Sequence, residues 1–195
     1  MIQPDFQKFP KIPRLMRDCL ITEKIDGTNG VIHFGERDGE GFMPMHVGSR
    51  NRWLTLESDN FGFARWAQEN MDDLELLGPG YHFGEWWGLG VQRRYNQDVK
   101  RFSLFNVHRW GNKMDRPLCC GVVPVLHDGV FTTDVVEHTL EQLGLTGSIA
   151  APGFMDPEGI IIWHSHARCL FKYTLGDDGH KDNRWLETGY IDKGK

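Results

Sequence analysis

Charged residues lie within the apolar, strand-like segments of this chain, and this feature constrains its fold more than any other. Four of five such segments carry a charge at or near an apolar face, at Lys24, Glu85, Glu158 and Lys172, and the fifth carries Phe105. Burying a charge without a partner costs several kcal/mol, so a stable fold has to pair such residues. The sequence therefore predicts that these segments converge on one site.

The first charge belongs to a short segment, residues 23–30, that joins two predicted strands. Apolar residues precede and follow it, and its second half has the composition of a turn. The two-residue period of a strand would place Lys24 and Asp26 on one face, with Glu23 and Ile25 on the other. Taken alone, a lysine in such a pattern is most often a solvated surface charge. Its role depends on the other charged segments.

Hydrophobic spacing predicts a strand-rich domain with two helices. Apolar residues recur every three or four positions in residues 60–77 and again in residues 133–143, as on one face of a helix. The apolar stretch 117–126 is expected to cover a sheet, residues 1–20 to form an irregular arm, and the polar tail from Gly176 to be partly ordered at best. Strands are predicted around Ile21 and at residues 31–34, 43–47, 81–88, 102–107, 157–163 and 169–173.

Length and composition indicate a single cytoplasmic domain, residues 1–195. No apolar run is long enough to span a membrane, and the start of the chain lacks a secretory signal pattern. The four cysteines form no C-x-x-C pair, which is typical of reduced thiols in the cytoplasm. The formal net charge of −5 argues against a protein that coats nucleic acid through bulk charge. We therefore expect no membrane partner, and only a local patch for any nucleic acid.

The best local patch follows the strand predicted at 81–88. Four cations surround Tyr95 within residues 90–101, and such a mixture can track a nucleic-acid backbone while stacking on bases. A solvated loop would have the same composition. The candidate nucleic-acid contacts are Arg93, Arg94, Lys100 and Arg101, with Arg52 from an earlier segment.

Six segments, taken in order, resemble the motifs of the covalent nucleotidyltransferase superfamily of ligases and capping enzymes. The closest resemblance is to the ATP-dependent RNA ligases of the RNA ligase 2 and editing-ligase type. The first segment is Lys24-Ile25-Asp26-Gly27, which Thr28-Asn29 extends as in the RNA ligase branch. The others are Ser49-Arg50, Phe83-Gly84-Glu85, residues 102–107 with Phe105 at the aromatic position, residues 158–162, and Leu170-Phe171-Lys172. The resemblance extends from about residue 21 to residue 174.

This resemblance implies an α+β fold: two antiparallel β-sheets with flanking helices, in an ATP-grasp-like adenylyltransferase domain that holds the nucleotide between the sheets. It implies ATP and Mg²⁺ or Mn²⁺ as cofactors, with Lys24 attacking the α-phosphorus of ATP. A free lysine amine is almost wholly protonated at neutral pH, and nearby cations would favour the uncharged form that attacks. The implied catalytic residues are Lys24, Asp26, Glu158 and Lys172, and the implied nucleotide contacts are Glu23, Ile25, Arg50, Glu85, Phe105 and Lys172.

The same resemblance implies a task for each contact. Glu85 would bond the ribose, Phe105 would stack on adenine, and Glu158 would hold the metal or the lysine. Asp26 would orient the lysine and its nucleotide, and Arg50 would contact the sugar and later a nucleic-acid phosphate.

The chain also departs from the family pattern. Thr174 stands where a second lysine is common, and Trp163 and His164 follow the 158–162 segment where a lysine is common. Each change removes a phosphate contact. The stretch after Lys172 is too short for the C-terminal domain of larger ligases. We therefore expect a catalytic domain alone, without an accessory domain, which an accessory protein could replace.

The implied activity is the sealing of 3′-OH to 5′-phosphate ends, on RNA rather than DNA. Three alternatives stay open: an ATP-dependent DNA ligase-like enzyme, a GTP-using capping-type enzyme, and a nucleotide- or nucleic-acid-binding module whose catalysis has decayed.

Overall fold

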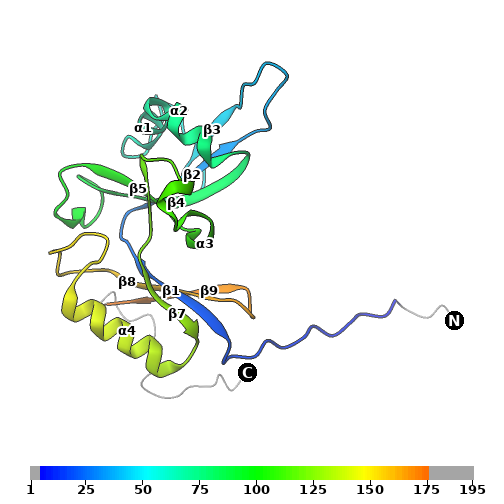
Figure 1. Cartoon of the computed structure of the whole chain (residues 1–195), viewed down its shortest axis with the longest axis vertical. Helices are drawn as coiled ribbons and strands as arrows, with labels where there is room; N and C mark the ends of the chain where they lie inside the picture. The colour runs from blue at the N-terminus through cyan, green and yellow to red at the C-terminus, as the bar shows by residue number, and fades with distance from the viewer. Residues whose placement is uncertain (1–4, 176–195) are drawn as a thin grey trace.

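The computed structural model describes residues 5–175, which form two lobes, each built on one β-sheet (Figure 1). The prediction of an α+β fold with two sheets and flanking helices is confirmed. The ATP-grasp-like arrangement stays a prediction, and the predicted polar tail from Gly176 lies outside the described residues. Within residues 5–175, none of the helices has the length and apolar character needed to cross a membrane.

The lower lobe in Figure 1 is a four-stranded antiparallel sheet with one long helix packed against it. Its strands, in spatial order, are β7 (Val125–Val130), β1 (Asp18–Lys24), β8 (Gly159–His164) and β9 (Cys169–Thr174). The helix is α4 (Thr133–Thr146), which begins where the Thr132 hydroxyl accepts the N–H of Val135. One face of α4 and alternate residues of β1 and β8 form a buried cluster that includes Val136, Leu140, Leu143, Ile21, Ile160 and Ile162. The apolar residues spaced three and four apart in residues 133–143 form this buried face of α4.

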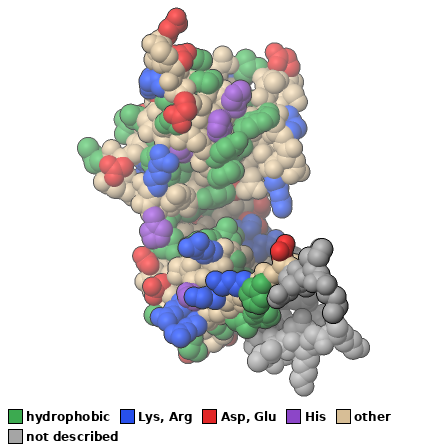
Figure 2. Space-filling model, turned by 90° about the vertical axis from the view of Figure 1, so that its right-hand side faces the viewer, with side chains coloured by type: hydrophobic (Ala, Val, Ile, Leu, Met, Phe, Trp, Pro, Cys, Tyr) green, Lys and Arg blue, Asp and Glu red, His purple; other side chains and the backbone are tan. Residues whose placement is uncertain are grey.

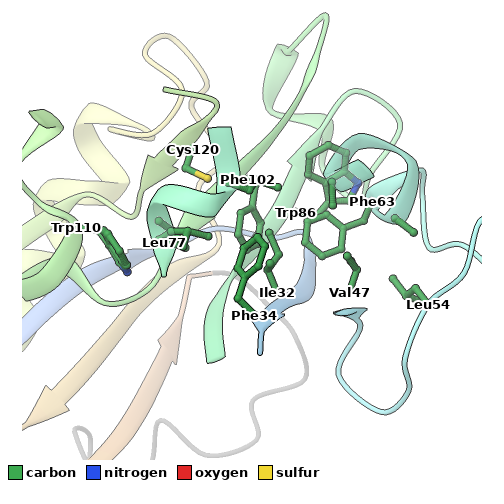
Figure 3. Packing of buried hydrophobic residues seen from close by; sticks show 14 of the residues in the cluster. Ile32, Phe34, Val47, Leu54, Phe63, Leu77, Trp86, Phe102, Trp110 and Cys120 are labelled. Carbon is green, nitrogen blue, oxygen red and sulfur yellow. The ribbon is translucent and has the colours of Figure 1, made fainter. Parts of the chain in front are cut away.

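The upper lobe is a five-stranded sheet with short helices around it. Its strands, in spatial order, are β3 (Met45–Gly48), β2 (Thr28–Phe34), β4 (Gly80–Gly88), β5 (Lys100–Leu104) and β6 (Cys120–Val122). β6 runs parallel to β5, so the prediction of two purely antiparallel sheets is wrong for this edge. Figure 3 shows the core on one face of this sheet, where Phe63 and Trp86 lie beside Ile32 and Phe102.

The helix predicted at residues 60–77 is broken into three short elements. They are α1 (Phe63–Glu69), α2 (Met71–Leu74) and the 3-10 helix η1 (Glu75–Leu77). Asn70 separates the first two with φ −112° and ψ 18°, and its side-chain amide donates to the Trp66 carbonyl at 2.8 Å. Asparagine competes for backbone partners in this way, which ends a helix although the apolar spacing continues. Further short helices are η2 (Arg94–Asn96), α3 (Val107–Trp110) and η3 (Lys113–Asp115).

Two further predictions, for residues 117–126 and for residues 1–20, also need correction. The apolar stretch 117–126 does not cover a sheet; it supplies β6 to the upper sheet and the start of β7 to the lower one. The irregular arm extends only through residue 17, because β1 already begins at Asp18. Within residues 5–17 all side chains are exposed, and the arm projects away from the body in Figure 1.

Candidate active site

The chain passes from the lower sheet to the upper sheet between Lys24 and Thr28, and the candidate site lies at this crossing. Lys24 is the last residue of β1 and Thr28 the first of β2, and the two strands belong to different sheets. Strand geometry therefore does not continue through Asp26, contrary to the simplest interpretation of the two-residue period. On the cavity side of β1 the period holds, since Leu20, Thr22 and Lys24 all line the same cavity.

Lys24 forms an ion pair with Glu158, which immediately precedes β8. The register of β1 and β8 pairs Lys24 with Gly159, so the ammonium group and the neighbouring carboxylate are brought together by the sheet itself. The side chains are 23% and 12% exposed. Glu158 Oε1 contacts Lys24, whereas the buried Oε2 has no hydrogen-bond partner among the described residues. A buried carboxylate oxygen without a partner suits a cation.

Gly159 fixes the backbone beside this pair. Its φ is 150°, and a Cβ there would lie 2.1 Å from the carbonyl oxygen of Tyr173 on β9. Only glycine permits this close approach of the two strands.

Glu23 and Ile25 point away from the ion pair. The Glu23 carboxylate is buried and accepts the Ser148 hydroxyl together with the N–H groups of Ile149 and Ala150, both at 2.8 Å. Ile25 is buried against Trp87, Tyr95 and neighbouring apolar residues. Both residues line the cavity, and their buried side chains anchor the crossing.

Asp26 is held by two residues from the loop between β4 and β5. Its carboxylate accepts the Nε of Arg93 at 3.1 Å, and its N–H donates to the Tyr95 hydroxyl at 2.7 Å. Arg93 also pairs with Asp156 at 2.8 Å. Burial raises the pKa of the Tyr95 phenol, so this hydroxyl stays protonated and neutral. The crossing is thus fixed to the segments on either side of it.

Glu85 lies on β4 opposite the crossing and is only 8% exposed. Its carboxylate accepts the N–H of Gly27 at 3.1 Å and the side-chain amide of Asn29 at 3.3 Å. Burial raises the pKa of Glu85 to about 7, and Glu158 and Asp26 act in the same direction, whereas Lys24 and the Gly27 bond oppose the shift. These influences show that the three carboxylates and the lysine lie within one electrostatic neighbourhood.

A cavity of about 750 Å³ is lined by Lys24, Asp26 and Glu85, whereas the predicted residue Glu158 does not itself line it. Arg50, Phe105 and Lys172 reach it from other elements, and all three side chains are exposed. No acidic partner of Arg50 or Lys172 is found in residues 5–175. The cavity therefore joins buried carboxylates on one side to two free cations and an aromatic ring on the other. The predicted residues that line it are Glu23, Lys24, Ile25, Asp26, Arg50, Glu85, Phe105 and Lys172.

A family model described as RNA ligase matches residues 17–174, which is most of the chain. The chain belongs to the RNA ligase family. Its fold is similar to solved structures of a Naegleria gruberi RNA ligase. A mutant with AMP and Mn gives a TM-score of 0.59 at 18% identity, and another with ATP and Mn gives 0.57 at 20%. These matches cover 82% and 89% of this chain but 50% and 52% of the other, so this chain spans about half the length of the Naegleria protein. No curated protein matches the chain.

The cations predicted to bind nucleic acid do not line the cavity of this RNA ligase family member. Arg93 pairs with Asp26 as described, and Lys100 Nζ donates to the Phe61 carbonyl at 2.7 Å. Arg101 and Arg52 also have partners within the fold, and Arg94 is exposed. Tyr95 is wholly buried between Trp87 and Phe154, so the idea that it stacks on bases is wrong. A role in nucleic-acid binding stays a prediction for the five cations.

Sequence reasoning missed several residues that shape the site. Thr22 could have been found, because it stands two positions before Lys24 on the same face of β1. Asn29, Tyr95 and Trp163 could not, since their roles depend on contacts with residues far away in the sequence. Asn29 bonds Glu85, Tyr95 bonds the Asp26 backbone, and Trp163 lines the cavity from β8.

Substituting Gly27 by alanine should destabilise the fold by about 2 kcal/mol, the magnitude typical of overpacking a buried position. A Cβ at Gly27 would lie 2.4 Å from the Trp86 carbonyl oxygen and 2.8 Å from Trp87 Cβ. Urea unfolding measures the change. Gly39→Ala is the matched control, because its added methyl would meet no atom within 4 Å. Equal stability of the two variants would contradict the close approach.

The raised pKa of Glu85 should make stability depend on pH in the protein without nucleotide. The folded state keeps the carboxyl protonated to higher pH than the unfolded state, so this contribution to stability is full below about pH 4.5 and is lost as pH rises toward 7. The free energy of unfolding should fall by up to about 3 kcal/mol across this window.

Urea unfolding at a series of pH values checks this expectation. Glu85→Gln should flatten the pH profile over the same window, because glutamine does not titrate. A variant whose profile has the same slope as that of the original protein would show that Glu85 is not the group responsible.

Proposed function

We propose that this member of the RNA ligase family is an ATP-dependent RNA ligase that joins 3′-OH to 5′-phosphate ends through a covalent lysyl-AMP. The observation that carries the proposal is Lys24, a half-buried amine at the wall of a cavity with a carboxylate in direct contact. The cavity has the size of a small-molecule site. The bound ATP, AMP and Mn of the Naegleria structures support ATP and Mg²⁺ or Mn²⁺ as cofactors here.

The nucleotide contacts follow from the walls of the cavity. Glu85 would bond a ribose hydroxyl and Phe105 would stack on adenine; both line the cavity, and Phe105 is 41% exposed, which supports these roles. Arg50 and Lys172 carry the free positive charge that phosphates require. Glu23 and Ile25 would contact the nucleotide through their backbone, since their side chains are occupied in the fold.

A divalent metal fits the carboxylate of Glu158. The unpartnered Oε2 supplies a hard oxygen ligand inside a largely buried site. Such an ion would neutralise charge on the phosphates as pyrophosphate departs.

The chain's own residues can account for the first chemical step. The Lys24 ammonium must lose a proton before it attacks, and Glu158 is the carboxylate in contact with it. The neutral amine then forms a bond to the α-phosphorus while the bond to pyrophosphate breaks, and the nitrogen releases a further proton. Asp26, anchored by Arg93, keeps the crossing and therefore Lys24 in position.

Trp163, one of the departures from the family pattern, lines the cavity, so the lost lysine there bears on this step, whereas the other two departures bear on later steps. Thr174 is the last residue of β9 and His164 the last of β8, where His164 bonds the Leu15 carbonyl. Neither side chain lines the cavity. The missing phosphate contacts would weaken the grip on nucleic acid, which an accessory protein could supply.

Three alternatives remain as outcomes of the same experiments. A DNA ligase-like enzyme would prefer nicked DNA, and a capping-type enzyme would label with GTP rather than ATP. A module with decayed catalysis would bind ATP in calorimetry without a covalent adduct. The buried carboxylates of Glu85 and Glu158 beside the half-buried Lys24 argue against decay, because buried charges without a role destabilise a fold.

Incubation with ATP labelled at the α-phosphate and Mg²⁺ should give a covalently labelled protein. Lys24→Ala should abolish the label, because it removes the attacking nitrogen. Glu158→Gln should reduce the rate by about a hundredfold or more, since it removes the negative charge that contacts the amine and would hold the metal. Labelled bands on denaturing gels, followed over time, measure both effects.

The matched control is Glu75→Gln, which removes a carboxylate from an exposed ion pair with Arg37. It should label at the original rate. Equal labelling of Lys24→Ala, or no labelling of the original protein, would refute the proposal. Ligation of nicked duplexes with RNA or DNA on either side of the nick, with ATP and with preadenylylated substrate, then separates the substrate classes.

A further inference from the structure

Aromatic side chains lie in a row across the open face of the upper sheet. Ring neighbours run from Phe83 through Tyr81, His33 and His46 to Trp53, and Phe105 joins Phe83 through its backbone; we call these six residues the aromatic row. Its members on β2, β3 and β4 alternate with residues of the opposite face, where Ile32, Phe34 and Trp86 form the core. The row is therefore the solvent side of the sheet, and the described helices do not fill it.

The geometry of the row is that of neighbouring rings in contact. The centroids of His33 and Tyr81 are 4.3 Å apart, and Tyr81 and Phe83 lie 6.1 Å apart with planes only 10° from parallel. His46 bridges to Trp53 at 5.7 Å. At the other end, the N–H of Phe105 donates to the Phe83 carbonyl at 2.9 Å, which joins the row to the cavity.

These rings are too exposed to serve the fold alone. Trp53 is 51% exposed, Tyr81 59% and Phe83 56%. A sheet face that only meets water normally carries polar side chains, and contiguous exposed apolar surface marks a binding site. Figure 2 shows hydrophobic and histidine side chains lying together on the upper lobe, above the waist between the lobes.

We propose that the aromatic row binds the bases of the RNA strand that enters or leaves the active site. In other RNA-binding folds, aromatic rings on the face of a sheet stack on about two or three unpaired bases. A row of this size could hold a similar number of bases. The row is continuous with Phe105, the ring assigned above to adenine, so a strand with its end at Lys24 would pass over it. Arg52, which immediately precedes Trp53 and is exposed, adds positive charge at the far end.

This inference rests on the proposed RNA ligase function for the identity of the strand. A protein partner or a second copy of the chain would bind the row by burying apolar surface, which leucine provides as well as an aromatic residue does. A base requires the flat face of a ring. The two classes therefore respond differently to a leucine in place of an aromatic residue.

The test uses the whole chain and a fluorescent single-stranded RNA with a 3′-OH end, with affinity measured by anisotropy. Tyr81→Ala and Trp53→Ala should each weaken binding by about tenfold, and their double variant by more. Tyr81→Phe should bind as the original protein does, whereas Tyr81→Leu should be as weak as Tyr81→Ala. All of these variants should form lysyl-AMP at the original rate, because neither residue lines the cavity.

Phe171→Ala is the matched control, since Phe171 is 50% exposed on β9 of the other lobe and lines neither the row nor the cavity, and it should leave RNA affinity unchanged. Full RNA affinity in Tyr81→Ala and Trp53→Ala, or in Tyr81→Leu, would overturn the inference. So would self-association of the original protein, measured by light scattering, that these substitutions abolish.

Failure of the row and failure of the proposed function give different results. If the original protein forms no lysyl-AMP but binds RNA through Tyr81 and Trp53, the row stands and the ligase proposal falls. If it forms lysyl-AMP and binds RNA independently of these residues, only the row falls.

Discussion

The antiparallel register of β1 and β8 is the constraint on which the site depends. It pairs Lys24 with Gly159 and so delivers Glu158 to the ammonium group. Glycine at position 159 lets β9 approach closely on the other side, where any larger residue would strike the Tyr173 carbonyl. Since a slip of one residue in the register would turn Lys24 to the opposite face, the hydrophobic core beneath these strands also fixes the chemistry above it.

The second constraint is the crossing from the lower lobe to the upper lobe at residues 25–27. Three residues hold it, one on β4 and two in the loop that follows β4: Glu85 through the N–H of Gly27, Tyr95 through the N–H of Asp26, and Arg93 through the Asp26 carboxylate. Tyr95 adopts a left-handed backbone with φ 50°, as do both of its neighbours. Such conformations cost of order 1 kcal/mol or more each and persist only where surrounding contacts enforce them. Here the burial of Tyr95 against Trp87 and Phe154 and its bond to Asp26 supply those contacts.

The spacing of apolar residues predicted the strands and helices whose formation depends on residues nearby in the sequence. The alternation around Lys24 and the helical spacing of residues 133–143 gave a strand and a helix close to β1 and α4. The helix break at Asn70 was not predicted, because the apolar spacing of residues 60–77 continues through it. The Asn70 side chain bonds the Trp66 carbonyl and so competes with the backbone of the helix. The division of residues 117–126 between two sheets and the burial of Tyr95 depend on partners far along the chain. The pairing of the buried charges could be predicted from the free-energy cost of burying a charge alone. The carboxylate oxygen of Glu158 that has no partner could not, because it depends on which groups surround it in the folded chain.

The balance of charge in the site favours a metal-dependent reaction. Three carboxylates, those of Asp26, Glu85 and Glu158, lie close to Lys24, and Arg93 offsets the first of them. A triphosphate would bring further negative charge against these groups. Arg50 and Lys172 reach the cavity with exposed side chains, whereas Glu85 and Glu158 are buried. The raised pKa of Glu85 removes part of the repulsion by keeping that carboxyl partly protonated near neutral pH. Glu158 keeps a buried carboxylate oxygen without a hydrogen-bond partner among the described residues, and a divalent cation bound there would offset the negative charge of the carboxylates and the phosphates. Such an ion would also compete with Lys24 for the carboxylate, and its positive charge would favour the neutral amine that the proposed attack requires.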